Sequence, residues 1–252
     1  MINRQKYLFT SVLATAALLV GGVSSVSAQV PAGALTNFAA LGGTAVTCTG
    51  GSIVGDVGIS PGITAAYTNT GCLVTGGTPP ATNQAAVQAR ADLTGAYAAF
   101  QSMSAGCTAI TGSLAASNLA PGVYCVDAVA KTGLLTLTGP SSGVWVLLID
   151  GALTGTNFSV EMAGGAVPCN VFWVPGLAAT MTNSALKGSI VAGNEVSGSI
   201  TLTGGSLAGQ ALASVALTTT GTSVVGCQAL ATPLDTTTPV ITPSTPRYGH
   251  VD

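Results

Sequence analysis

Charged residues are scarce in this chain of 252 residues, and their scarcity excludes several classes of partner. Asp, Glu, Lys and Arg make up 6% of the sequence, against about a quarter in an ordinary globular protein. When Arg4 and Lys6 are set aside with the N-terminal segment discussed below, four basic residues remain against eight acidic ones, a net charge near −4 (4 − 8). Nucleic acids and anionic membranes bind clustered Lys and Arg. We therefore expect neither as a partner.

Common motifs for cofactors and metals are also missing. The one histidine is His250, close to the end of the sequence, and no two cysteines have CxxC spacing. Glycine pairs such as Gly42-Gly43 belong to no GxGxxG motif and are not followed by Gly-Lys, so they do not form a phosphate-binding loop. The sequence therefore predicts no metal and no cofactor.

The first 28 residues have the pattern of a secretory signal peptide. A basic start at residues 3–6 precedes an apolar run at 8–23, and Val26-Ser27-Ala28 supplies small residues for cleavage after Ala28. No later segment is long and apolar enough to span a bilayer. We expect a secreted or extracellular protein whose folded part begins at residue 29.

Six cysteines in an exported chain predict three disulfides. The sequence alone allows fifteen pairings of six cysteines. We favour bonds between neighbours in the chain: Cys48 with Cys72, Cys107 with Cys125, and Cys169 with Cys227.

Short alternating segments separated by glycine dominate residues 186–225. Ser199-Ile200-Thr201-Leu202-Thr203 is typical: apolar residues alternate with hydroxyl residues, which is the pattern of a β-strand. The outward positions of these strands carry Ser, Thr and Ala, where a solvated hairpin sheet would show charges. The pattern favours a β-solenoid with Ile, Leu and Val inside and small hydroxyl residues outside.

One convincing helix is predicted at residues 81–105. Its apolar residues recur at spacings of three and four, which makes a stripe that packs against another element. Residues 144–149 and 171–174 are apolar throughout and suit strands that are covered on both faces, so we expect the helix to lie over them. Residues 229–252 are rich in Thr and Pro and are expected to form an extended tail after a domain at 29–228.

Several fragments resemble, in their order, a known family. They are Gly55-Asp56-Val57-Gly58-Ile59-Ser60-Pro61-Gly62, Ala89-Arg90-Ala91-Asp92-Leu93-Thr94-Gly95-Ala96-Tyr97, Leu119-Ala120-Pro121-Gly122-Val123-Tyr124, Asn170-Val171-Phe172-Trp173-Val174, Gly188-Ser189-Ile190-Val191-Ala192 and Ser206-Leu207-Ala208-Gly209-Gln210-Ala211-Leu212-Ala213. Together they resemble the large microbial ice-binding, or antifreeze, protein family over residues 33–227. The chain differs from the better-known members in its six cysteines and in lacking a tidy Thr-Ala-x-Thr run on its late strands.

The resemblance implies both a fold and a function. The fold is a mostly β, right-handed, discontinuous β-solenoid of triangular section, a β-helix with one long α-helix packed alongside. The function is adsorption to an ice crystal surface through one flat Ser/Thr/Ala-rich face, which inhibits ice growth or recrystallisation without catalysis or a cofactor. We expect the protein to act as a monomer.

Strand periodicity then selects candidate ice-binding residues. If Ile200 and Leu202, Val215 and Leu217, and Leu135 and Leu137 point inward, the residues between them point outward. The candidates are Thr136, Thr138, Ser199, Thr201, Thr203, Ser214, Ala216 and Thr218.

Two other classes of function stay open at this stage. A cell-surface adhesin or matrix protein would use the same neutral face against another solid or a partner. A polysaccharide-active solenoid enzyme would need paired carboxylates, and the carboxylates are scattered along the sequence: Asp56, Asp92, Asp127, Asp150, Glu161, Glu195 and Asp235.

Overall fold

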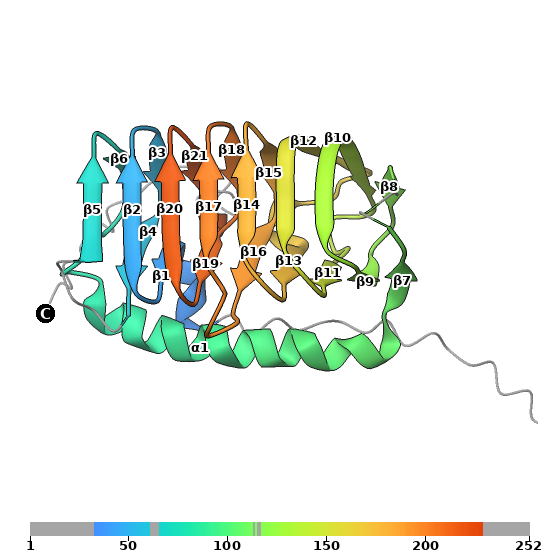
Figure 1. Ribbon diagram of the computed structural model, residues 1–252, viewed down its shortest axis with the longest axis horizontal. Coiled ribbons are helices and arrows are strands. Elements are labelled where there is room, and N and C mark those ends of the chain that lie inside the picture. Colours follow the sequence, from blue (N-terminus) through green and yellow to red (C-terminus); the bar gives the residue numbers. More distant parts are fainter. Residues whose placement is uncertain (1–32, 61–65, 113, 115–116, 229–252) are drawn as a thin grey trace, which may run out of the picture.

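The computed structural model describes residues 33–60, 66–112, 114 and 117–228. The predicted signal peptide at 1–28 and the predicted tail at 229–252 lie outside the described residues. Within the described part, parallel strands form two sheets that curl around an apolar interior (Figure 1). The protein is a β-solenoid with one long α-helix along its side, as the sequence predicts.

Each turn of the solenoid places strands on three faces, which we call face a, face b and face c. Face a is the first sheet, and the second sheet bends between faces b and c. In the order of pairing, face a consists of β4 (Asp56–Ile59), β1 (Phe38–Gly42), β19 (Ala211–Ala213), β16 (Ser189–Ala192), β13 (Val171–Pro175), β11 (Trp145–Ile149), β9 (Gly122–Val126) and β7 (Thr108–Ile110).

Faces b and c share two long strands, β10 (Val129–Thr138) and β12 (Leu153–Ala163), whose first parts lie in face b and whose second parts lie in face c. The other strands of face b, in order of pairing, are β5 (Tyr67–Thr70), β2 (Ala45–Thr49), β20 (Ala216–Thr220), β17 (Ile200–Thr203) and β14 (Ala179–Thr182). The other strands of face c are β6 (Leu73–Val74), β3 (Ser52–Val54), β21 (Ser223–Val225), β18 (Ser206–Ala208), β15 (Ala185–Lys187) and β8 (Asn118–Leu119).

The helix interrupts the solenoid and runs along its length. The sequence predicts this helix at 81–105; the structure has α1 (Asn83–Ser102), which continues into the short 3-10 helix η3 (Met103–Gly106). Twenty residues make α1 about 30 Å long, so it carries the chain from the coil of β5 and β6 to the coil of β7 at the opposite end (Figure 1). Later coils then build back until β19, β20 and β21 pair with β1, β2 and β3.

Two apolar cores hold these parts together. One fills the solenoid and contains Trp145 and Trp173, both completely buried. The other lies between face a and the buried stripe of α1, where the rings of Phe100 and Phe172 are 5.2 Å apart between centroids. The helix therefore covers the two apolar strands β11 and β13, while their tryptophans point away from it into the solenoid. Residues of the stripe are Ala86, Ala89, Leu93, Ala96 and Phe100, with Met103 packed partly beside them.

Three disulfides add covalent links within this body. The structure joins Cys48 to Cys72, Cys107 to Cys125 and Cys169 to Cys227, the same neighbour pairs that the sequence favours. Short 3-10 helices precede β1 (η1, Ala34–Asn37) and β13 (η4, Pro168–Asn170). Among the described residues, no helix is both long enough and apolar enough to cross a membrane.

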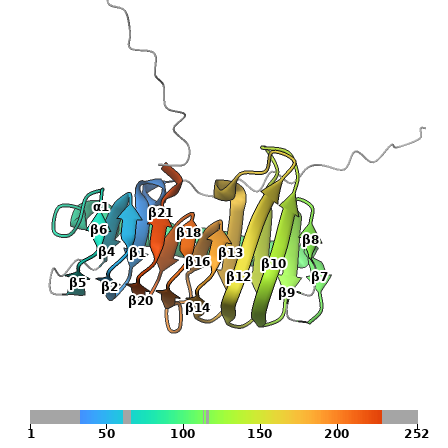
Figure 2. The same ribbon diagram turned by 90° about the horizontal axis from the view of Figure 1, so that it is seen from above.

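The corner between faces b and c has the same backbone conformation in successive coils. A residue in the left-handed region follows the face b strand directly, for example Gly204 (φ 64°) after β17 and Asn183 (φ 48°) after β14. Glycine and asparagine are the residues that adopt this conformation at least cost. The repeated corner keeps the ends of the face b strands aligned (Figure 2).

Candidate functional site: the threonine face

Six neighbouring strands of face b share one sequence pattern, Thr-x-Thr, with both threonines pointing away from the core. All twelve side chains are half-buried or exposed. We call these residues the threonine face: Thr68 and Thr70 on β5, Thr47 and Thr49 on β2, Thr218 and Thr220 on β20, Thr201 and Thr203 on β17, Thr180 and Thr182 on β14, and Thr154 and Thr156 on β12.

The strand register aligns the threonines in two straight columns. Thr201 pairs with both Thr218 and Thr180, and the same column extends to Thr68 at one end and Thr154 at the other. Thr203 pairs with Thr220 and Thr182, in a column that extends from Thr70 to Thr156. Strands lie about 4.8 Å apart, and alternate residues of one strand about 6.6 Å. The hydroxyl and methyl groups of the threonines thus form a two-dimensional lattice.

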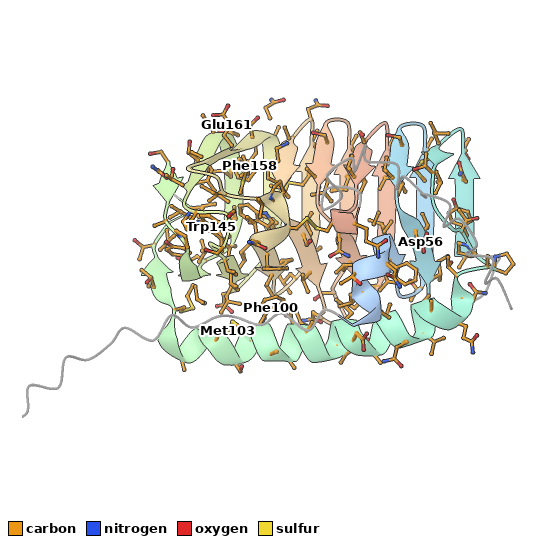
Figure 3. All side chains as sticks on the ribbon, turned by 180° about the vertical axis from the view of Figure 1, so that it is seen from behind. Asp56, Phe100, Met103, Trp145, Phe158 and Glu161 are labelled. Atoms are coloured by element: carbon orange, nitrogen blue, oxygen red, sulfur yellow. A yellow bond between two sulfur atoms is a disulfide. The ribbon has the colours of Figure 1, made fainter. Side chains whose placement is uncertain are left out.

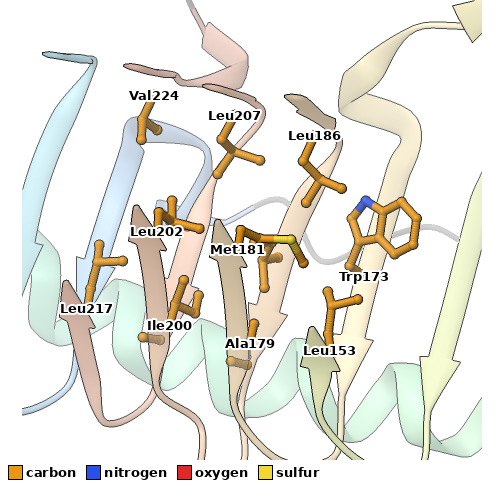
Figure 4. Close-up of a cluster of buried hydrophobic side chains, with 14 of the residues drawn as sticks. Leu153, Trp173, Ala179, Met181, Leu186, Ile200, Leu202, Leu207, Leu217 and Val224 are labelled. Atoms are coloured by element: carbon orange, nitrogen blue, oxygen red, sulfur yellow. The ribbon is translucent and has the colours of Figure 1, made fainter. Parts of the chain in front are cut away.

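The interior residues beneath the lattice make it rigid. On β2, β20, β17, β14 and β12 the residues that alternate with the threonines are buried, including Leu217, Ile200, Leu202, Met181 and Leu153 (Figure 4). A branched Cβ leaves threonine few χ1 rotamers, and continuous parallel pairing fixes the backbone. The side chains of the threonine face are therefore held in place before any ligand arrives.

Charge is absent from this surface. None of the residues of these six strands in face b is ionisable at neutral pH. The outward positions two residues before the first threonine column carry small side chains, such as Ala45, Ala216 and Ser199. Such a surface orders no tightly bound hydration shell of the kind that surrounds an ion. It can present only hydroxyl groups, methyl groups and flat backbone to a ligand.

Sequence periodicity predicts the outward direction of five of the eight candidates on face b. Ser199, Thr201, Thr203, Ala216 and Thr218 all lie outward on face b. The strand pattern of β17 and β20 was sufficient to predict their orientation, and their role in binding ice stays a prediction.

Three candidates lie elsewhere. Thr136 and Thr138 are outward, but on face c, because β10 bends at Gly133 and Thr136 pairs with Glu161. Ser214 was expected outward and is only 1% exposed, so that expectation is wrong. The chain is still turning the corner at Ser214: its hydroxyl donates to the Asn194 carbonyl and its own carbonyl accepts from Arg90, which buries it. Val215, expected inside, is half-buried at the same corner.

Sequence reasoning missed nine of the twelve threonines. The signal that could have found them is a repeat of Ala or Ser, then Thr-x-Thr at alternate positions, as in Ala45-Val46-Thr47-Cys48-Thr49 and Ala178-Ala179-Thr180-Met181-Thr182. Its irregular spacing along the chain hides it, since α1 and loops of different lengths separate the copies. The missed residues are Thr47, Thr49, Thr68, Thr70, Thr154, Thr156, Thr180, Thr182 and Thr220.

The carboxylates have no comparable arrangement. Asp56 accepts a hydrogen bond from the Gly77 amide (2.7 Å) and Asp92 one from the Ala34 amide (2.6 Å), so both hold segments of backbone. Asp56 and Glu161 lie towards opposite ends of the solenoid (Figure 3). Within the part of the chain that the structure describes, no group of three or more His, Cys, Asp or Glu side chains could hold a metal ion.

One groove does contain two carboxylates. It has a volume of about 560 Å³, lies between α1 and the ends of the face a strands, and is lined in part by Asp127, Asp150 and Tyr97. Both aspartates are exposed, whereas a glycosidase sets its acid apart from its base by burying one carboxyl group. The described residues that line the groove include no basic side chain. The groove therefore offers little of the chemistry that the enzyme hypothesis needs.

Fold and site together define a class: β-solenoids with a lateral helix that display a flat, uncharged, hydroxyl-bearing face. The model of the ice-binding-like family matches residues 40–225, most of the chain. This protein belongs to that family.

Individual relatives and solved structures agree with this assignment. The chain is 29% identical over 215 residues to the ice-binding protein K3-B1 of Typhula ishikariensis, a match that covers 75% of this chain and 87% of the relative. It is 34% identical over 177 residues to an ice-binding protein of Nostoc sp. (strain HG1), covering 68% of this chain and 63% of the relative. The crystal structure of an ice-binding protein from Antarctomyces psychrotrophicus superposes with a TM-score of 0.64 at 29% identity, over 76% of this chain and 95% of that one.

Proposed function

We propose that this protein binds ice through the threonine face and thereby inhibits ice growth or recrystallisation. The observation that carries the proposal is the register of six Thr-x-Thr strands in two columns, with no charge among them. An ice surface is a flat lattice of oxygen atoms, and a rigid lattice of hydroxyl and methyl groups can dock against it with many small contacts at once. The relatives that bear the name ice-binding protein support the same reading.

Secretion and the lack of catalysis belong to the same proposal. Three disulfides suit an oxidising compartment outside the cytosol, and the first 28 residues have the pattern of an export signal. Adsorption needs no cofactor, no nucleic acid and no membrane, and we propose that the monomer is sufficient because one chain contains the whole threonine face.

The test is ice-growth inhibition by the purified full chain, read as crystal shape, as the gap between melting and freezing, and as the rate of recrystallisation. Thr201→Lys puts a charged, protruding side chain at the centre of the threonine face and is expected to remove most activity. Thr136→Lys is the matched control: the same change on face c, expected to leave activity near that of the unmodified protein. Both variants are checked for folding by circular dichroism.

Unshaped crystals and unhindered coarsening with folded, unmodified protein would contradict ice binding and favour the adhesin alternative. If Thr136→Lys abolished activity and Thr201→Lys did not, ice binding would stand but the threonine face would be the wrong site.

A further inference from the structure

Apolar side chains line one edge of the threonine face, at the corner where the chain passes from face a to face b. Three consecutive coils each contribute one: Leu177 before β14, Val196 before β17 and Val215 before β20. Leu177 is 49% exposed and Val196 is 91% exposed, while Val215 is half-buried. We call these three residues the apolar margin. An exposed patch of this kind contributes little to the core and suggests contact with something outside the fold.

The coils of the margin are bonded to one another. The Val215 amide donates to the Gly198 carbonyl (3.1 Å), and the Asn194 side chain donates to the Gly176 carbonyl (2.9 Å). These bonds fix the connector that carries Val196 beside the corner that carries Leu177 on one side and Val215 on the other. The three apolar residues are therefore carried by neighbouring connectors of consecutive coils.

The connector before β17 is also the longest of the three. It runs over residues 193–199, whereas residues 176–178 and 214–215 suffice in the neighbouring coils. The Asn194 side chain accepts from the amides of Val196 (3.0 Å) and Ser197 (3.2 Å), which fixes the turn at its tip. The extra residues thus form an ordered turn that holds a valine out in solvent.

Contacts with α1 brace the same connector. Glu195 forms an ion pair with Arg90, and the Thr94 hydroxyl donates to the other Glu195 oxygen (3.1 Å). Arg90 also donates to the Ser214 carbonyl. In Figure 1 the connector between β16 and β17 reaches down to α1. Because Glu195 points towards the helix, its negative charge is balanced by Arg90 on α1 and does not lie among the apolar side chains of the margin.

The margin is continuous with the threonine face. Val196 leads directly to Ser199 and Thr201 in the same coil, and Leu177 leads to Thr180 in the next. Towards β12 the equivalent corner carries Asp150 and, in the coil after that, Asp127, whereas towards β2 it carries Gly43 and Thr44. The apolar segment is therefore confined to three coils of the edge, with a charged corner beyond it on the β12 side.

We propose that the apolar margin is a second contact strip for ice, which extends the threonine face beyond its strands. This inference rests on the proposed function. Hydroxyl and methyl groups of the threonines match the ordered lattice, and the margin displaces mobile water at its edge, which is favourable for apolar surface. Arg90 and Glu195 act as positioning residues, since they hold the connector and do not touch ice.

The experiment compares two double variants of the full chain. Leu177→Asp with Val196→Asp changes the margin; Leu73→Asp with Val87→Asp makes the same chemical changes at exposed residues of β6 and α1, 66% and 57% exposed. We expect the margin variant to lower the melting–freezing gap about threefold through lost apolar contact and added charge, and the control to leave it unchanged. All four sites are exposed, so circular dichroism should show an unaltered fold; if the margin variant does not fold, Val196→Asp alone replaces it.

Thr201→Lys in the same series separates the two proposals. Loss of activity in Thr201→Lys with full activity in the margin variant would overturn the margin and leave the threonine face intact. Equal loss in the margin variant and in its control would also overturn the margin, because the effect would then follow net charge. Full activity in Thr201→Lys would overturn the threonine face and the margin with it.

Discussion

Faces b and c are built from the same coils, yet only one of them carries an ordered chemical lattice. Every coil passes from a face b strand to a face c strand through one left-handed corner, and β12 belongs to both faces. Face b repeats Thr-x-Thr six times. At equivalent outward positions face c has Ser52, Ser223, Ser206 and Ala185, followed by charged Lys187 and Glu161 on neighbouring strands. The comparison teaches that the solenoid backbone supplies the same spacing on both faces, while the outward side chains decide which chemical groups occupy the lattice.

The largest expected difference between the two faces comes from placing the same positive charges on each of them. Thr201→Lys with Thr218→Lys alters two paired positions of face b, and Ala185→Lys with Ser206→Lys alters two paired positions of face c. Pressing a charge against a solid without a partner costs several kcal/mol, and about 1.4 kcal/mol is a factor of ten. We expect ice-growth inhibition to fall tenfold or more in the face b variant and to change little in the face c variant.

Similar losses from the two variants would show that any added charge blocks adsorption. The threonine lattice would then not be what distinguishes the faces. The thermal unfolding temperature of each variant is measured alongside its activity, so that a loss of folding is distinguished from a loss of ice binding.

Loosening the outermost coil should have an intermediate effect. In face b, β5 pairs with a strand on one side only, and Cys48–Cys72 ties the turn after it to β2. Closing a loop of this length contributes about 3 kcal/mol. We expect Cys48→Ser with Cys72→Ser to lower thermal stability and to reduce activity by about twofold, because Thr68 and Thr70 lose their fixed positions while the other five strands keep theirs.

Cys107→Ser with Cys125→Ser is the control for the disulfide, since that bond joins the segment after α1 to β9 in face a. It should lower stability without a matching loss of activity per folded molecule. Equal losses of activity in both cysteine variants would mean that global stability, and not the outer threonines, sets the activity.

Extending the lattice tests the comparison in the opposite direction. Ala130 pairs with Thr154 at the β10 end of face b, in register with the first threonine column. Ala130→Thr continues that column by one residue, so we expect a small gain in ice-growth inhibition, below about twofold because a single contact is added at the edge. Leu134→Thr, on the part of β10 that lies in face c, should give no gain. A lower activity in Ala130→Thr would show that the site ends before β10.

The smallest expected effect is that of pH. The parts of the strands that lie in face b contain no ionisable group that titrates near neutrality, whereas in face c β12 carries Glu161 and β15 carries Lys187. Burial raises the pKa of Tyr97 on α1 above its ordinary value of 10.0, so its contribution to stability is present at neutral pH and is lost only as the pH rises through that higher value. Ice-growth inhibition should therefore stay constant from mildly acidic to mildly alkaline buffer. A steep change in that range would point to an ionisable group at the site.

Local sequence patterns were enough to predict the fold but not the site. Glycine-separated alternation and the stripe from Ala86 to Phe100 predicted strands and a lateral helix, because both depend on nearby residues. Alternation also predicted that Thr136 and Thr201 point outward, but it could not assign them to different faces. That assignment depends on the bend of β10 at Gly133 and on which strands pair, and β2 pairs with β20 although Thr44 and Val215, just before them, are 171 positions apart.

Because of that long-range pairing, the threonine face is complete only after the late strand β20 has been synthesised. The strands β5 and β2 are synthesised early, and β17, β14 and β12 much later, yet β20 must lie between the two groups. Contacts so distant in sequence form slowly, and a product that stops short of residue 216 would hold two separate patches of threonine. The two columns of threonines are therefore continuous only after β20 has been synthesised and has paired with β2 and β17. A molecule that lacks β20 has most of the threonines, but they form two separate patches.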